Sequence, residues 1–272
     1  MEHSIGLSHV GNARELGGYA VGGKTVRSGL LLRAADLAEA AAEDLERLEK
    51  TYHVAAVVDF RMSAERALRP DPVLPGAENH PLPVMEPVDY EGFDDEAMAA
   101  FLDPNGDRLA MMKQSVELGL LSNTLYADFL RSERGKAAYR AFFRLLLDLP
   151  ENRAILWHCT DGKDRTGLAA MLLLTALGAS WETVMEDYLL TNVWNEKKLA
   201  ATRAWVEHSA LEPELWEMVI FGAGGVAEIY MKNARKALEE DYGSVEGYLA
   251  QALGVGEDER AILRGKFLGS AD

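Results

Sequence analysis

Alternating runs of hydrophobic and polar residues predict strands and helices in turn along the chain. Two short β-prone runs between residues 19 and 34 are joined by Gly22-Gly23, a two-residue loop that tolerates the positive φ of a tight hairpin. The valine-rich run "HVAAVVDFR" (53–61) and the run "RAILW" (153–157) are apolar throughout. Such runs predict strands that are buried on both faces of a parallel sheet.

The remaining periodic segments predict helices. Leucines at helical spacing predict a helix over 36–50 with Asp36 as its cap, and further helix-like segments fill roughly 107–148. From about 181 to 268 the pattern is helical only, with Ser244 as one expected cap. The predicted fold class is therefore α/β, with a mostly parallel central sheet flanked by helices and an extended helical C-terminal portion.

The domain organisation follows from length and from one irregular region. The 272 residues suffice for one large domain, and we expect residues 1–272 to form a single unit. Six prolines between Pro70 and Pro87, followed by an acidic, turn-rich stretch, predict a long loop or flap over about 70–106.

Composition narrows the functional classes. The net charge of −16 disfavours nucleic acid and anionic lipid surfaces as partners, so any bound anion must be captured by a local site. A single cysteine excludes an internal disulfide and a cysteine-rich metal site, and we expect neither metal nor cofactor. The absence of a signal-like or membrane-spanning apolar run predicts a cytoplasmic enzyme of bacterial type.

The only cysteine lies in "ILWHCTDGKDRTGLAAMLLLTALG" (155–178), between a predicted strand and a predicted helix that starts near Arg165. A tight loop in that position gathers backbone N–H groups at the positive end of a helix dipole, which is a site for a phosphate dianion. The same groups favour the thiolate form of Cys159 and are expected to depress its pKa. Cys159 is therefore the predicted nucleophile.

Other residues of this loop have chemical roles that suit phosphoryl transfer. Arg165 presents a planar fork for two phosphate oxygens, and Thr166 places a hydroxyl beside the sulfur to ease its departure. Gly162 lets the backbone approach the anion, and His158 is expected to order the loop rather than act as a base. The predicted phosphate-binding residues are Thr160, Asp161, Gly162, Lys163, Asp164 and Arg165.

A buried cysteine without catalytic function is the alternative interpretation. It requires His, Gly, Arg, Thr and Gly to stand by chance at −1, +3, +6, +7 and +8 from Cys159, a coincidence on the order of one in 10⁵ to 10⁶ at ordinary residue usage. The "GK" pair does not make a nucleotide-binding P-loop, because Asp164 replaces the required Ser or Thr. The functional interpretation is much the stronger.

The segment "HCTDGKDRTG" resembles the His-Cys-x5-Arg-Thr-Gly signature of the cysteine-based protein tyrosine phosphatases. Its "GKDRTG" ending is similar to the atypical bacterial tyrosine/serine phosphatases of the PtpB type, some of which also hydrolyse phosphoinositides. "NARELGGY", "LLLRAADL" and "VVDFRMSAE" resemble other blocks of that family in the same order, and "ALEEDYGSVEGYLAQALGV" resembles its carboxyl-terminal end. The resemblance implies one α/β phosphatase domain, no metal, and helices that can lie over the active site as a lid.

The identity of the general acid stays open. Asp164 is the first candidate, because a carboxylate beside a thiolate and a phosphate dianion is expected to have a raised pKa. Bracing of the loop is an equally weighted role for it. Asp89, Asp94 and Asp95 on the predicted flap are the second candidates, since a mobile loop can close over substrate.

Four further residues are candidates for supporting or binding roles. Asp59 and Arg61 end a predicted strand and would lie on the ligand-binding edge of the sheet, with a strand-end ion pair as the modest alternative. The resemblance suggests that Arg14, with Glu15, braces the phosphate loop. Lys163 is expected to project into the loop mouth, where it meets a second phosphate or only offsets neighbouring acids.

The predicted activity is hydrolysis of phosphomonoesters in phosphoprotein or phosphopeptide substrates, on phosphotyrosine and, as a second specificity, on phosphoserine or phosphothreonine. A phosphoinositide or inositol-phosphate phosphatase that uses the same loop is the alternative. Three rival functions fit the sequence less well. An arsenate reductase would need further cysteines, and a sulfurtransferase would need a loop of different length. A catalytically inactive binding module would be expected to have lost Cys159 or Arg165.

Overall fold

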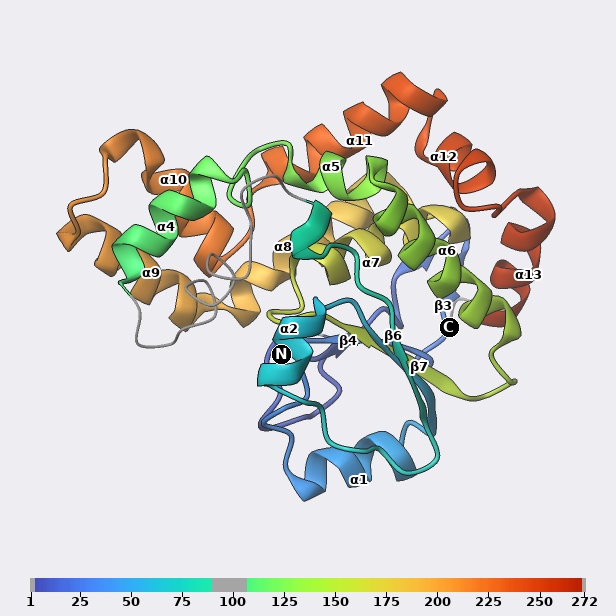
Figure 1. Cartoon of the computed structure of the whole chain (residues 1–272). Helices are drawn as coiled ribbons and strands as arrows, with labels where there is room; N and C mark the ends of the chain where they lie inside the picture. Colours follow the sequence, from blue (N-terminus) through green and yellow to red (C-terminus); the bar gives the residue numbers. More distant parts are fainter. Residues whose placement is uncertain (1–2, 90–106, 271–272) are drawn as a thin grey trace.

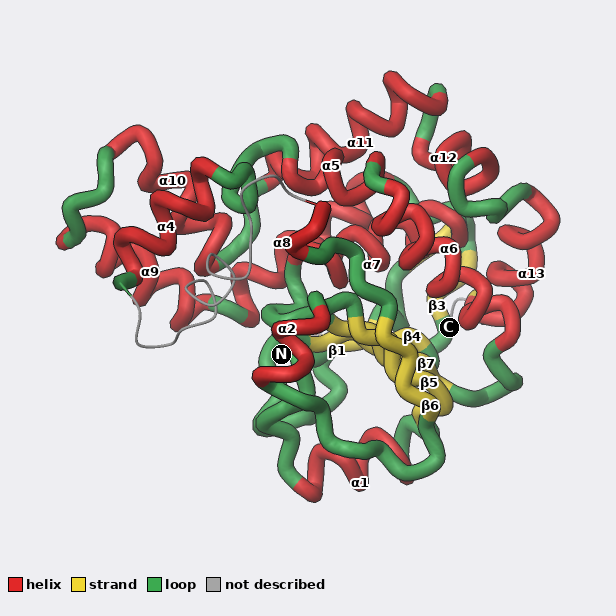
Figure 2. The backbone as a smooth tube through the Cα atoms, viewed as in Figure 1, coloured by secondary structure: helices red, strands yellow, loops and turns green. Residues whose placement is uncertain are grey.

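A five-stranded sheet forms the centre of the protein in the computed structural model, which describes residues 3–89 and 107–270 (Figure 2). Its strand order is β1-β4-β7-β5-β6, and all neighbours are parallel except β1 and β4. The strands are β1 (Arg14–Glu15), β4 (Leu31–Ala34), β5 (Val54–Asp59), β6 (Glu78–Pro81) and β7 (Ala154–His158). The predicted class, α/β with a mostly parallel sheet, is confirmed.

Side chains of successive residues on the central strand pack on opposite faces of the sheet, as the pleat requires. Ile155 and Trp157 of β7 belong to the larger hydrophobic core, whereas Ala154 and Leu156 belong to a second core on the side of α1 (Ala42–Lys50). Because both faces are covered, β7 is fully buried. This burial explains the continuous apolar run in the sequence.

Most helices cover one face of the sheet, and α1 lies on the other (Figure 1). The larger group comprises α5 (Leu125–Arg131), α6 (Glu133–Asp148), α7 (Asp164–Leu177), α8 (Trp181–Trp194), α11 (Glu228–Tyr242), α12 (Val245–Gln251) and α13 (Glu257–Phe267). Ser244 caps α12 by accepting a hydrogen bond from the backbone N–H of Gly247. The cap that the sequence predicts there is confirmed.

A second group of helices projects to the left in Figure 1 and has a hydrophobic core of its own. Its buried residues are Met112, Val206, Leu211, Val219 and Ile220. They come from or lie beside α4 (Arg108–Glu117), α9 (Glu196–His208), α10 (Trp216–Val219) and the π-helix η3 (Ile220–Gly224), with the short 3-10 helix η2 (Pro213–Leu215) between α9 and α10. We call this group the side lobe.

The predicted hairpin is present in a second, antiparallel sheet of order β2-β3-β8. β2 (Ala20–Val21) and β3 (Lys24–Val26) flank Gly22 and Gly23, whose φ angles are +55° and +79°. β8 (Leu268–Ser270) pairs with β3 and directly follows α13. This strand closes the C-terminal portion, which is otherwise helical from α8 onward as predicted.

Two local predictions are wrong. The first helix begins at Ala42 rather than after Asp36, because the Asp36 carboxylate caps a turn at Ala38 and pairs with Arg69. The proline-rich stretch is not all loop, since β6 joins the edge of the sheet with Pro81 as its last residue, and an edge strand tolerates proline. α2 (Ser63–Leu68) precedes this stretch and the 3-10 helix η1 (Pro87–Asp89) ends its described part.

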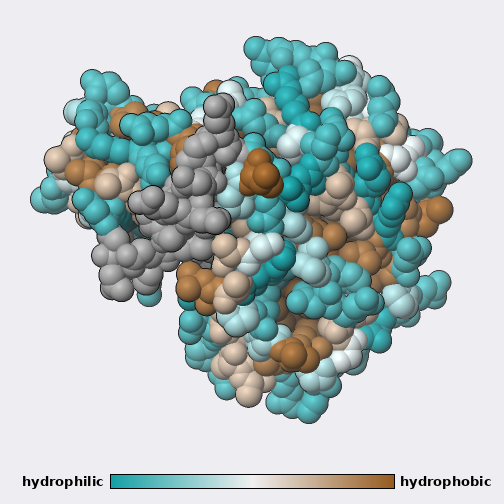
Figure 3. Space-filling model, in the orientation of Figure 1, coloured by the Kyte–Doolittle hydropathy of each residue, from teal (hydrophilic) through white to brown (hydrophobic). Residues whose placement is uncertain are grey.

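The surface is mainly hydrophilic on the face shown in Figure 3, where hydrophobic side chains form several separate groups. Within residues 3–89 and 107–270, no helix is long and apolar enough to cross a membrane. The hydrophilic face agrees with the strongly acidic composition.

Candidate active site

The loop between β7 and α7 lies at the carboxyl edge of the parallel sheet, where ligands bind in such folds. Cys159 follows the strand directly and is 1% exposed, and α7 begins at Asp164. The first turn of this helix leaves backbone N–H groups without intrahelical partners, pointing toward the loop. The predicted order of strand, tight loop and helix is therefore present.

Gly162 allows the loop to pass close to the neighbouring strand. Its φ is +64°, and a Cβ at this position would lie 2.4 Å from the carbonyl carbon and oxygen of Ala34. The Gly162 carbonyl accepts hydrogen bonds from Asn12 Nδ2 at 2.8 Å and from Arg33 Nη2 at 2.9 Å. Because buried donors hold this carbonyl, the loop has a fixed backbone before any anion binds.

Arg14 supports the conformation of the loop through Asn12. It is fully buried, donates to the side-chain oxygen of Asn12, and bonds Asp187 Oδ1 through Nε at 3.0 Å. Asp187 also pairs with Arg33, so one carboxylate joins the two arginines. Burial and then the charge of Arg33 lower the pKa of Arg14 to about 10, so the guanidinium remains charged at neutral pH. Glu15 instead accepts from the backbone N–H of Gly29.

Glu65 holds Arg165 in place, a contact that the sequence analysis missed. Arg165 Nη1 lies 2.6 Å from Glu65 Oε2, and Nη2 lies 3.0 Å from Oε1. The hydroxyl of Thr160 also donates to Glu65, and the backbone N–H of Met62 donates to its Oε2 at 2.8 Å. Burial of Glu65 would raise its pKa, but the charge of Arg165 and these hydrogen bonds outweigh it and lower the pKa to about 2.

The sequence did contain a weak signal for Glu65. It occupies the third position of α2, where an acidic side chain reaches back to the N-cap backbone. That pattern predicts a helix start, and only the fold shows that the same carboxylate also faces Arg165.

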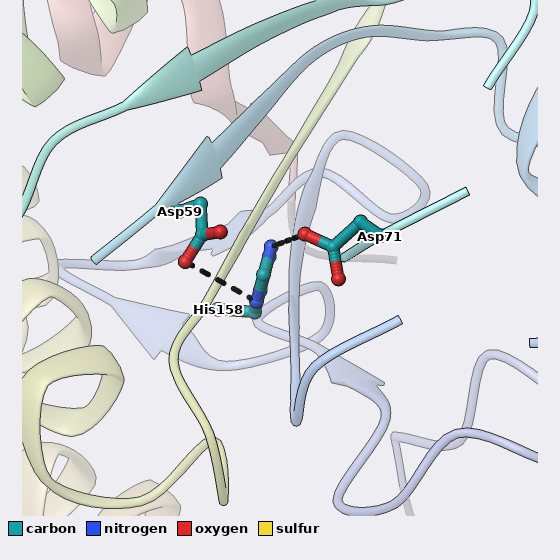
Figure 4. A group of neighbouring side chains, drawn as sticks. All are labelled: Asp59, Asp71 and His158. Carbon is teal, nitrogen blue, oxygen red and sulfur yellow. Dashed lines mark ion pairs between the residues drawn. The ribbon is translucent and has the colours of Figure 1, made fainter. Parts of the chain in front are cut away.

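Asp59 lies beside His158 and Asp71 (Figure 4) and forms a buried ion pair with Arg61, which also lines the cavity described below. Arg61 Nη2 lies 2.7 Å from both Asp59 Oδ2 and Asp71 Oδ2, while its Nε also bonds the Asp59 carboxylate. The strand-end ion pair is therefore present, and the position of Arg61 in the cavity lining leaves its predicted binding role a prediction. Asp71, which the sequence analysis did not single out, completes the pair from the segment after α2.

His158 lies between the two carboxylates of this network. Its Nε2 lies 3.1 Å from Asp71 Oδ2, and its Nδ1 lies 3.9 Å from Asp59 Oδ1 and 3.3 Å from the carbonyl oxygen of Cys159. Burial opposes protonation, but the contact with Asp71 and the charges of both carboxylates outweigh it, so the pKa of His158 is raised. The contact with the Cys159 carbonyl suits the predicted ordering role.

The spacing of this network would also suit a metal ion, because one ligand atom each of Asp59, Asp71 and His158 lies within 4.8 Å of the others. Arg61 donates to both carboxylates, however; Asp59, Arg61 and His158 are buried, and the Asp71 side chain is 5% exposed. Protein cations therefore already neutralise the two acids.

Lys163 lines the cavity described below, but its ammonium binds backbone carbonyls, and its charge offsets the nearby acids Asp161 and Asp164. It is 2% exposed, and its Nζ donates to the Gly222 carbonyl and, at 3.3 Å, to the Gly225 carbonyl, at the end of η3. Neighbouring Asp161 binds Lys198 of α9 at 2.6 Å. Burial would raise the pKa of Asp161, but the charges of Lys198 and Lys163 outweigh it and lower the pKa. Two side chains of the loop thus hold the side lobe.

Asp164 begins α7 with a side chain that is 27% exposed. Its Oδ1 accepts a hydrogen bond from the Tyr126 hydroxyl at 2.5 Å, and its Oδ2 lies 3.8 Å from Lys163 Nζ. Thr166 is fully buried, and within the described residues its hydroxyl makes no hydrogen bond. The predicted contact of this hydroxyl with the Cys159 sulfur is therefore not formed here.

Of the three alternative acids on the predicted flap, Asp89 lies within the described residues. Asp89 on η1 binds Arg134 Nε at 2.5 Å and accepts from the backbone N–H of Glu86 at 2.7 Å. It does not line the cavity described next. Asp94 and Asp95 lie outside the described residues.

A cavity of about 680 Å³ opens over the loop. Loop residues line one part of it, a second part is charged or polar, and the remainder is apolar. The loop residues are Thr160, Asp161, Lys163, Asp164 and Arg165, and the other charged or polar residues are Asp36, Arg61, Glu65, Arg69, Arg108, Ser115 and Lys198. The apolar lining comprises Met62, Leu68, Met85, Met111, Met112, Leu120, Leu121, Leu125, Phe129 and Ala223. A cation-bearing, N–H-rich loop beside an apolar wall can receive a phosphate group attached to an apolar or aromatic body.

Comparisons with known proteins agree with this geometry. The family model described as tyrosine phosphatase family matches residues 5–269. A protein of Cupriavidus necator, provisionally named a tyrosine-protein phosphatase, is 34% identical over 267 residues, which cover 98% of this chain and 89% of the relative. The triple specificity protein phosphatase PtpB of Mycobacterium tuberculosis is 31% identical over 261 residues, covering 90% of this chain and 92% of that protein. A tyrosine-protein phosphatase of Nostoc commune is 33% identical over 110 residues, 40% of this chain and 37% of the relative.

Proposed function

The chain belongs to the tyrosine phosphatase family and is a hydrolase of phosphoproteins, and on that premise we propose that it works through a phosphocysteine intermediate on Cys159. The observation that carries the proposal is the loop of residues 159–165 between β7 and α7. Its one arginine is fixed by Glu65 beside an apolar cavity. This arrangement supplies a nucleophile, an anion site and room for the body of the substrate.

In the first step the Cys159 sulfur attacks phosphorus, so that an S–P bond forms while the P–O bond to the substrate breaks. Arg165 binds two phosphate oxygens during this displacement. Its guanidinium is already oriented by Glu65, with contacts of 2.6 and 3.0 Å, so little reorganisation is needed when substrate arrives. Asp164 gives a proton to the departing oxygen.

In the second step water attacks phosphorus, the P–S bond breaks and inorganic phosphate leaves. The Asp164 carboxylate takes the proton of the attacking water, which restores the acid for the next cycle. The buried Thr166 hydroxyl, which has no hydrogen-bond partner among the described residues, can donate to the departing sulfur. We propose that residues 1–272 form one catalytic domain in which Asn12, Arg14, Arg33 and His158 support the loop.

Phosphotyrosine is the proposed principal substrate, because the apolar wall of the cavity suits an aromatic ring. Activity on phosphoserine and phosphothreonine is also proposed, supported by a relative whose name describes triple specificity. The Lys163 ammonium is held by two backbone carbonyls, so it gives no support to binding of a second phosphate such as that of an inositol phosphate.

The test is turnover of p-nitrophenyl phosphate and of a phosphotyrosine peptide by wild type, Cys159→Ser and Cys159→Ala. We expect full wild-type activity in excess chelator and a loss of at least about 10³-fold in both variants, because a serine hydroxyl is not ionised at neutral pH. Near-wild-type turnover in either variant would sink the proposal. Far-UV circular dichroism of the variants serves as the control for folding.

A further inference from the structure

Two buried tyrosine hydroxyls form a chain of hydrogen bonds that ends at the carboxylate of Asp164. Tyr126 of α5 donates to Asp164 Oδ1 at 2.5 Å, and Tyr188 of α8 donates toward the Tyr126 oxygen at 3.2 Å. The Tyr188 hydroxyl also lies 3.3 Å from the carbonyl oxygen of Ala227, just before α11. Helices far apart in the sequence thus converge on the first residue of α7.

Tyr126 is built into the core so that its hydroxyl has little freedom. The residue is 2% exposed, and its ring lies between those of Tyr188 and Tyr230, with centroid distances of 6.1 and 5.7 Å. Burial and then the negative charge of Asp164 raise the pKa of Tyr126 well above its ordinary value. Tyr126 therefore stays protonated over the working pH range and always offers a donor.

Asp164 needs such a partner. Its side chain is 27% exposed, and the terminal torsion of an aspartate is broad, so an unrestrained carboxyl would present either oxygen to the substrate. A donor fixed on Oδ1 makes that oxygen an acceptor in both protonation states. The transferable proton then belongs on Oδ2.

Resting on the proposed role of Asp164 as the general acid, we propose that Tyr126 is a positioning residue that fixes Oδ1 and so reserves Oδ2 for proton transfer. In the first step the proton leaves Oδ2 for the departing oxygen as the P–O bond breaks. In the second step Oδ2 takes a proton from the attacking water as the P–S bond breaks. Tyr126 keeps its own proton throughout.

Other charged or titratable groups surround Asp164 from every element packed against it. They are Lys163 and Arg165 in the loop and at the start of α7, Tyr126 on α5, Tyr139 on α6, Tyr188 on α8 and Tyr230 on α11. Among the described residues, Tyr126 is the one that makes a hydrogen bond to the Asp164 carboxylate. Tyr230, whose ring centroid lies 5.7 Å from that of Tyr126, makes no such bond among these residues and is the control.

The experiment compares Tyr126→Phe with Tyr230→Phe on two substrates. p-Nitrophenyl phosphate has a good leaving group that needs little protonation, whereas a phosphoserine peptide has a poor one that requires a proton. We expect Tyr126→Phe to lower kcat for the peptide by about ten-fold and kcat for p-nitrophenyl phosphate by less than about three-fold, with KM little changed. Tyr230→Phe should stay within about two-fold of wild type on both.

A double-mutant cycle with Asp164→Asn distinguishes positioning of Asp164 from a merely structural role of Tyr126, because only positioning makes the effects of the two mutations on kcat depend on each other. If Tyr126 acts through Asp164, then Tyr126→Phe should have no further effect on kcat in the Asp164→Asn background. An equal loss on both substrates, or a loss that persists in that background, overturns the inference. An unchanged kcat for the peptide overturns it as well.

A second variant guards against a folding defect in Tyr126→Phe. Tyr188→Phe leaves Tyr126 in place and removes only the hydroxyl behind it, so it should give a smaller loss with the same selectivity for the poor leaving group. Equal losses on both substrates in Tyr188→Phe would count against the proposal. Failure of this inference differs from failure of the proposed function, since the latter appears as retained turnover in Cys159→Ser.

Discussion

The contact between Arg165 and Glu65 orients the Arg165 guanidinium before substrate binds. The pair is buried, with side chains 11% and 8% exposed, and its two hydrogen bonds fix the plane of the guanidinium. Removing one partner of such a pair leaves the other charge buried without compensation, which is costly. The stability of the fold and the geometry of the site are therefore linked at Glu65.

This link predicts an acid-dependent loss of stability. Because the pKa of Glu65 falls from 4.5 to about 2 on folding, ionised Glu65 stabilises the folded state fully above pH 4.5. That contribution is lost progressively as pH falls from 4.5 toward about 2. Urea unfolding at pH 7, 4.5 and 3 should show a stability difference between wild type and Glu65→Gln that shrinks at the lowest pH.

Glu86→Gln is the matched control for that series. Glu86 also accepts hydrogen bonds at α2, from the backbone N–H and the hydroxyl of Ser63, but these contacts are exposed. We expect its stability difference from wild type to be small throughout. A Glu65→Gln difference that is constant from pH 7 to 3 would contradict the assigned role of the pair.

At the scale of elements, the phosphate loop and the side lobe are joined by polar contacts. Lys163 caps the end of η3, and Asp161 binds Lys198 of α9 at 2.6 Å. The side lobe also supplies part of the cavity wall, through residues such as Arg108, Met112 and Ala223. Loosening these contacts should therefore let the lobe move and expose the loop.

Lys198→Ala tests this coupling. Without the ion pair, amide hydrogens in residues 196–208 and 220–224 should exchange faster with solvent, by roughly 2- to 5-fold, since a partly exposed pair contributes up to about 1 kcal/mol. Alkylation of Cys159 by iodoacetamide should also accelerate. Lys197→Ala removes an exposed lysine from the same helix and should change neither rate; equal rates in the two variants would refute the coupling.

The sequence predicted elements whose hydrophobic pattern is local and missed those fixed by distant partners. β5, β7 and the hairpin were recognisable because continuous apolar runs and a Gly-Gly pair are typical of buried strands and tight turns. The start of α1 was not recognisable, because Asp36 forms a hydrogen bond with Arg69, which is 33 residues away in the sequence. β6 was hidden by its prolines, which only an edge position permits.

The same distinction holds for the site. Cys159, Gly162 and Arg165 follow from the spacing within one loop, whereas Glu65, Asp71, Tyr126 and Asp187 reach the loop or its supports from elsewhere in the chain. The hydrogen bonds of Lys163 could not be predicted, because nothing local shows that the carbonyls of Gly222 and Gly225 would come within reach.

At the scale of the whole molecule, a rigid layered core presents the loop and a smaller lobe completes the cavity. The sheet and its helices bury the larger core, which includes Cys159, while the side lobe has a separate cluster of buried residues. The whole chain has a net charge of −16, so under the proposed mechanism the phosphate is attracted locally by the loop N–H groups and Arg165. The cavity therefore combines a cationic, hydrogen-bonding end with an apolar wall.

The most direct test of the proposed mechanism is rapid-quench trapping of the intermediate, with peptide mass spectrometry of enzyme mixed with p-nitrophenyl phosphate and stopped in acid. We predict one added phosphoryl group on the peptide that contains Cys159, appearing before steady state and absent in Cys159→Ser. A phosphoryl group on any other residue, or full turnover with no covalent adduct at any time, would contradict the mechanism.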